Sequence, residues 1–87
     1  MPTIRWCVKV RSYGKLADLL GQETDVDIDV PCTVDELRAH LAAIYPDAAQ
    51  PLASKRVLAC VGDTVVPNSH VVAPGTVVEL LAPVSGG

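Results

Sequence analysis

The chain has 87 residues, and its seven Lys or Arg against ten Asp or Glu give a formal charge of −3; this length supports one hydrophobic core and excludes a multidomain enzyme. Hydrophobic residues make up 49% of the chain, which favours a folded protein, yet no apolar run reaches the roughly 18 residues that a membrane span needs. The negative charge argues against nucleic acid as a ligand, and the lack of a basic and then apolar leader predicts a cytoplasmic protein.

Two strands are expected in the first third of the chain, because apolar and polar residues alternate there with a period of two. The apolar positions of the first strand are Ile4, Trp6, Val8 and Val10. Those of the second are Val26, Ile28 and Val30, and they alternate with Asp25, Asp27 and Asp29. This row of carboxylates discourages edge-to-edge aggregation. Between the strands, leucines at helical spacing before Gly21 predict only one or two helical turns.

The main helix is expected to follow Pro31. Thr33 and Glu36 have the Thr-x-x-Glu spacing of a capping box, which predicts Thr33 as the N-cap. The apolar stripe of this helix consists of Val34, Leu37, Leu41 and Ile44, whereas Asp35, Arg38 and Ala42 are predicted to face away. Pro46 should end the helix after about three turns.

The last third is poor in charge. Residues 57–61 form an apolar run that suits a strand covered on both faces, residues 64–66 a short strand, and residues 76–82 another apolar strand after the Pro74-Gly75 turn. The count is five strands and one main helix, an α+β protein. Between residues 57 and 87 the only charges are Asp63 and Glu79. We therefore expect a partner surface here that includes Leu81, Pro83 and Val84.

No side-chain active site is evident. His40 and His70 are the only histidines, and neither has the spacing of a metal or catalytic site. The aspartates of the second strand lack the glycine and the closing glutamate of a calcium loop. Cys7 has no histidine beside it in sequence that could activate it. All three cysteines, Cys7, Cys32 and Cys60, are interpreted as reduced thiols. We expect no metal site and no bound cofactor.

The C-terminal sequence Pro83-Val84-Ser85-Gly86-Gly87 is the remaining candidate. Residues without a Cβ can pass through a narrow channel, and Pro83 would stiffen the exit from the last strand. The reacting group would then be the carboxylate of Gly87, carried by a tail of residues 83–87 on a domain of residues 1–82. The alternative is a frayed end without function.

These features together resemble the ubiquitin-like sulfur carriers, most closely the small subunit of molybdopterin synthase. The matching features are the leucine-rich turn that ends in Gly21, the helix start Thr33-Val34-Asp35-Glu36-Leu37, the Pro74-Gly75 turn and the tail from Pro83 to Gly87. Typical members differ by having a second proline at the position of Ala82, an acidic pair at Thr76-Val77 and an asparagine at Gly62. The resemblance implies a β-grasp fold, with a hairpin of the first two strands, a helix across the sheet and the last strand parallel to the first.

The resemblance also implies a function. An adenylating enzyme related to ubiquitin-activating enzymes would activate the Gly87 carboxylate with ATP, and the acyl adenylate would become a thiocarboxylate. The tail, residues Pro83, Val84, Ser85 and Gly86, would enter the large subunit of molybdopterin synthase, and the sulfur would pass to a pterin precursor. The chain would thus be a sulfur-donating subunit that is not catalytic alone. Alternatives are carriers for cysteine, thiamin or tRNA thiolation, a protein modifier, and a β-grasp interaction module.

Overall fold

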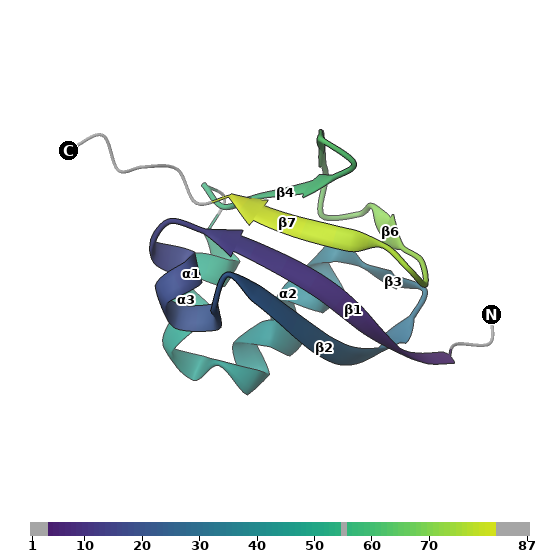
Figure 1. The fold of residues 1–87 in the computed structure, drawn as a ribbon, viewed down its shortest axis with the longest axis horizontal. Coiled ribbons are helices and arrows are strands. Elements are labelled where there is room, and N and C mark those ends of the chain that lie inside the picture. The colour runs from purple at the N-terminus through teal and green to yellow at the C-terminus, as the bar shows by residue number, and fades with distance from the viewer. Residues whose placement is uncertain (1–3, 55, 82–87) are drawn as a thin grey trace.

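The computed structural model describes residues 4–54 and 56–81. Strand β1 (Ile4–Tyr13) pairs antiparallel with β2 (Glu23–Val30), and β7 (Val77–Leu81) lies parallel to β1 on its other side. Strand β4 (Leu58–Val61) pairs antiparallel with β7, and β5 (Thr64–Val66) completes the order β2-β1-β7-β4-β5 (Figure 1). This mixed five-stranded sheet confirms the predicted β-grasp fold.

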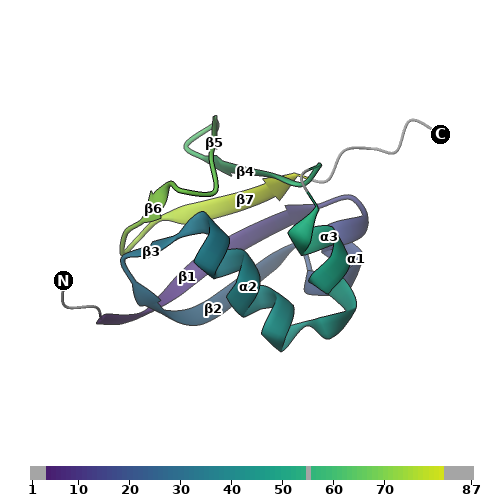
Figure 2. The same cartoon turned by 180° about the vertical axis from the view of Figure 1, so that it is seen from behind.

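The helices are α1 (Lys15–Leu20), α2 (Val34–Ile44), the 3-10 helix η1 (Pro46–Ala48) and α3 (Ala49–Ala53). Figure 2 shows α2 and α3 on one face of the sheet, with α1 beside α3 at the end where β1 is connected to β2. A second, two-stranded sheet of β3 (Cys32–Thr33) and β6 (Val71–Val72) lies beside the start of α2. No helix in residues 4–54 or 56–81 has the length and apolar character to cross a bilayer.

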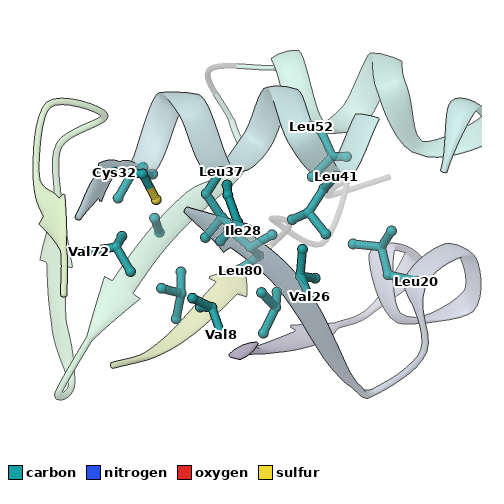
Figure 3. Packing of buried hydrophobic residues seen from close by; sticks show 14 of the residues in the cluster. Val8, Leu20, Val26, Ile28, Cys32, Leu37, Leu41, Leu52, Val72 and Leu80 are labelled. Carbon is teal, nitrogen blue, oxygen red and sulfur yellow. The ribbon is translucent and has the colours of Figure 1, made fainter. Parts of the chain in front are cut away.

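The hydrophobic core lies between the sheet and α2 (Figure 3). It is built from the inward side chains of the strands, among them Val8, Val26, Ile28 and Leu80, and from Leu37, Leu41 and Leu52 of the helices. Each fully buried side chain of this kind contributes about 1.5–3 kcal/mol through burial. The core therefore fixes which face of β1 and β7 points outward.

The predicted helix start is confirmed. The backbone N–H of Glu36 donates to Oγ1 of Thr33 at 3.1 Å, and the backbone N–H of Thr33 donates to Oε1 of Glu36 at 2.9 Å. This reciprocal capping box satisfies two amides at the helix terminus that have no partner within the helix.

Arg38 corrects the predicted helix stripe, because it is only 9% exposed instead of facing away. Its Nη1 donates to the carbonyls of Leu52 and Ser54 at 3.0 and 3.3 Å, and its Nη2 donates to the carbonyl of Val57 at 2.5 Å. Burial lowers the pKa of this guanidinium. Arg38 thus fastens the segment between α3 and β4 to α2.

Other expectations about burial were wrong at the ends of elements. Ile4 and Trp6 are exposed, although they continue the alternation of β1, because β7 pairs with β1 only from Lys9 onward and leaves this end of β1 without a neighbour on that side. Ile44 is exposed on the last turn of α2, and Ala42 packs partly against the core. Strand β4 is covered on both faces only in its middle: Ala59 and Cys60, which point to opposite faces, are buried, whereas Leu58 at its start is exposed. The sequence interpretation also omitted the small β3–β6 sheet and the helical segment Pro46–Ala53.

Candidate functional site

The face of the sheet opposite the helices carries exposed apolar side chains on its β7, β4 and β5 half. We call this the apolar sheet face, and its members Leu58, Val65, Val77 and Leu81 are 37–56% exposed. Leu81 pairs in register with Tyr13 on one side and with Leu58 on the other, so these three residues lie side by side where β7 ends. The apolar sheet face therefore extends to the point from which residues 82–87 continue.

The candidate residues lie on both sides of the end of β7. Leu81, expected at a partner surface, is exposed at the end of β7. The remaining candidates, Pro83, Val84, Ser85, Gly86 and Gly87, lie outside the described residues. The structure therefore describes the base of the expected tail, and the roles of Leu81 and of the tail remain predictions.

The other half of the same face is charged. On β2, Glu23 accepts ion pairs from Lys9 at 3.1 Å and from Arg11 at 3.4 Å, and Arg5 lies 3.7 Å from Asp29. Lys9 and then Arg11 hold the pKa of Glu23 below its usual value. The outward surface is thus split along β1 into a charged half and an apolar half.

Tyr13 and Glu79 mark the boundary between the halves. The Tyr13 hydroxyl donates a 2.6 Å hydrogen bond to Oε2 of Glu79 across the β1–β7 pair. This bond and the nearby carboxylate raise the pKa of Tyr13. Tyr13 was not a candidate from the sequence, because only the parallel pairing of the first and last strands brings it next to Glu79 and Leu81.

Cys7 and Cys32 are poorly suited to nucleophilic chemistry. Cys7 is exposed on the charged half, but partial desolvation and the carboxylates of Asp25 and Asp27 raise the pKa of its thiol. Cys32 is buried, and burial raises its thiol pKa as well. Since the thiolate is the reactive form, both side chains are held in the unreactive state near neutral pH.

The histidines lie apart from the apolar sheet face. His40 is half-buried on α2, and His70 is half-buried in the loop before β6, where its backbone carbonyl accepts from Val34. Within residues 4–54 and 56–81, no group of three or more His, Cys, Asp or Glu side chains is arranged to hold a metal ion.

Comparison with known proteins places this geometry in a family. The model of the ThiS family matches residues 10–87. The molybdopterin synthase sulfur carrier subunit of Escherichia coli (strain K12) is 36% identical over 81 residues, which cover 92% of this chain and 99% of that protein.

Solved structures agree on the fold. SAMP1 from Haloferax volcanii superposes with a TM-score of 0.80 at 21% identity, covering 92% of this chain and 98% of that one. The ubiquitin of Caldiarchaeum subterraneum superposes with a TM-score of 0.62 at 15% identity, covering 97% and 100%. Taken with the family match over residues 10–87, the ubiquitin-like fold and the 36% identical relative show that this chain belongs to the ThiS family of sulfur carriers.

Proposed function

We propose that this protein carries sulfur as a thiocarboxylate on Gly87 for molybdopterin synthesis, as the small subunit of molybdopterin synthase. The observation that supports this pathway is the 36% identity to a molybdopterin synthase sulfur carrier subunit over nearly the whole of both chains. The protein would act in the cytoplasm, because the activation step consumes ATP.

The chemistry requires activation of the tail. A carboxylate is a poor electrophile, so its oxygen first attacks the α-phosphorus of ATP and pyrophosphate leaves. Hydrosulfide delivered by a sulfur donor then attacks the acyl carbon and AMP leaves, which gives the thiocarboxylate. The thiocarboxylate sulfur bonds to the pterin precursor, and water then cleaves the bond between this sulfur and the Gly87 carbonyl, which restores the carboxylate so that the cycle can repeat.

The adenylating enzyme and the large synthase subunit are the proposed sources of catalytic side chains. This division of labour agrees with the chemistry of the described residues, in which the exposed thiol of Cys7 has a raised pKa. The chain itself supplies a docking surface and a reactive end. It is a subunit and a covalent substrate in this proposal, not a catalyst alone.

The fold sets how far the reactive end can reach. Leu81 is held in β7, with β1 on one side and β4 on the other. Residues 82–87 can span at most roughly 20 Å when fully extended, at 3.3–3.6 Å per residue. An enzyme that docks on the apolar sheet face must therefore place its adenylation site within about that distance of Leu81, with Pro83, Val84, Ser85 and Gly86 in its channel.

Removal of Gly87 tests the carrier function directly. The truncated chain should keep its circular dichroism spectrum and melting temperature, because the core lies elsewhere, but pyrophosphate release by the adenylating enzyme should stop. A chain extended by one residue beyond Gly87 should behave in the same way. Normal turnover of either variant would overturn the proposal.

The product of sulfur transfer identifies the pathway. Intact mass measurement of the chain after reaction with the activating enzyme and a sulfur donor should show one oxygen replaced by sulfur. The loaded chain, mixed with the large synthase subunit and the pterin precursor, should form molybdopterin. Sulfur delivered instead to a thiazole, cysteine or tRNA product would contradict the molybdopterin assignment, and isopeptide-linked lysines would indicate a protein modifier.

A further inference from the structure

One carboxylate interrupts the apolar half of the sheet. Strands β7, β4 and β5 contain a single charged residue, Glu79, which lies between Val77 and Leu81 on the outward side of β7. Its neighbours in register are Arg11 on β1 and Cys60 on β4. A flat partner surface that contacts Val77 and Leu81 together must therefore also cover Glu79.

Within the described residues, the carboxylate of Glu79 has partners for only part of its hydrogen-bonding capacity. The hydroxyl of Tyr13 donates to its Oε2 at 2.6 Å, which fixes the carboxylate at the edge of the apolar sheet face. The ion pairs in residues 4–54 and 56–81 join Arg5 with Asp29, and Lys9 and Arg11 with Glu23, so Arg11 is engaged on the β2 side. An ionised carboxylate accepts up to about four hydrogen bonds, and the phenol fills one of these positions.

We propose that Glu79 is the specificity-determining residue of the apolar sheet face, and that the adenylating enzyme presents a cationic side chain to it. This inference rests on the proposed function, because the enzyme is its partner. Docking removes water from Glu79, and a desolvated carboxylate is unfavourable unless a donor replaces that water. An arginine or lysine opposite Oε1 would supply the donor, while Tyr13 keeps Oε2.

Such a pair adds selectivity to a surface that is otherwise apolar. Apolar contacts on Leu58, Val65 and Leu81 would accept many apolar partners. An enzyme without the cation, however, would leave Glu79 buried and unpaired, and binding would be penalised. One charge at a fixed position can thus separate the correct activating enzyme from related ones that share an apolar docking surface.

The test compares Glu79→Gln with Asp63→Asn. Glutamine keeps the shape of Glu79 but removes its charge. Asp63 is the other acidic residue of the C-terminal third and lies in the exposed β4–β5 turn at φ 66°, a conformation that asparagine tolerates. Pyrophosphate release would be measured with the purified adenylating enzyme of the same organism and ATP, while the concentration of the full-length carrier is varied.

The expected result is a rise of about tenfold or more in the KM for the Glu79→Gln carrier, because one member of a buried charge pair is lost. Its kcat should stay near that of the unsubstituted chain, since the reacting atoms on Gly87 are unchanged. The Asp63→Asn carrier should stay within about twofold in KM. Equal melting temperatures would show that neither substitution disturbs the fold.

The two proposals fail in different ways. A KM for Glu79→Gln within twofold of that of the unsubstituted carrier would overturn the role of Glu79 and leave the carrier function standing. A fall in kcat with unchanged KM would also overturn it, because the effect would then lie in the chemistry and not in docking. Absence of any turnover of the unsubstituted chain would overturn the proposed function, and the inference with it.

Discussion

Replacement of the buried Arg38 by methionine should destabilise the fold strongly. Methionine has a similar length but no hydrogen-bond donors, so the carbonyls of Leu52, Ser54 and Val57 all lose their hydrogen bonds from the guanidinium. Among the backbone hydrogen bonds of the described residues in this loop, the carbonyl of Ser54 has one further donor, the N–H of Val57 at 3.3 Å. The segment that leads into β4 would then lose its attachment to α2.

The magnitude follows from two opposing contributions. A hydrogen bond from a charged donor contributes about 1.5–3 kcal/mol, so three bonds give about 5–9 kcal/mol. Burial of the guanidinium, which also lowers its pKa, costs several kcal/mol that methionine avoids. The expected net loss is about 3 kcal/mol in the free energy of unfolding, equivalent to a fall of roughly 12–24 °C in Tm for a domain of this size.

Denaturant unfolding followed by circular dichroism measures this loss. Arg56→Met is the matched control, because Arg56 lies exposed on the same segment and its loss should change stability by less than about 0.5 kcal/mol. Arg38→Lys should fall between the two, since lysine keeps the charge but cannot reproduce the planar fork. A loss below about 1 kcal/mol for Arg38→Met would refute the reasoning and show that water satisfies the three carbonyls.

Three further predictions concern the capping box, docking and thiol reactivity. Thr33→Ala should cost about 1 kcal/mol in unfolding free energy, and Glu36→Ala less, with sulfur transfer unchanged in the folded protein. Leu81→Asp should raise the Kd for the large synthase subunit strongly, whereas Lys15→Ala and added salt should change it little, because the interface is mainly apolar. The alkylation rate of Cys7 should reach half its maximum at a pH above the ordinary cysteine pKa, because desolvation and two neighbouring aspartates disfavour the thiolate.

Each of these predictions has a contrary outcome. An unchanged denaturation midpoint for Thr33→Ala would mean that the cap contributes nothing to the stability of α2. Loss of binding by Lys15→Ala or by salt, with Leu81→Asp still bound, would move the docking site to the basic N-terminal segment. Rapid alkylation of Cys7 at neutral pH would contradict the direction of its pKa shift.

The strands were predictable where apolar and polar residues alternate along the sequence. In β2, Asp25, Asp27 and Asp29 are exposed, and the three residues that alternate with them, up to Val30, are buried. One face of this edge strand contacts solvent and the other packs against the helices. Arg38 was not predictable from the helix pattern. It is buried because Pro46–Ala53 turns back and packs beside α2, and so short a helical segment has little signal of its own.

The candidate surface was predictable only in part. Low charge in the last third correctly indicated exposed apolar residues near Leu81. The contributions of Tyr13 and Glu79 depend on the strand order, since residues 66 positions apart become neighbours only through the parallel pairing of β1 with β7. Alternation within a strand gives its faces, but it does not tell which strand lies beside it.

The central place of β7 affects how the protein matures in the cell. Strand β7 follows the other six strands in sequence but is inserted between β1 and β4, so the sheet cannot close until β7 has left the ribosome. Contacts between the two ends of a chain also slow folding. The apolar sheet face is assembled in the same step, because Leu58, Val77 and Leu81 come together only when β7 is in place. A nascent or truncated chain without β7 would lack this surface, so an activating enzyme that recognises it would select carriers in which the sheet has formed.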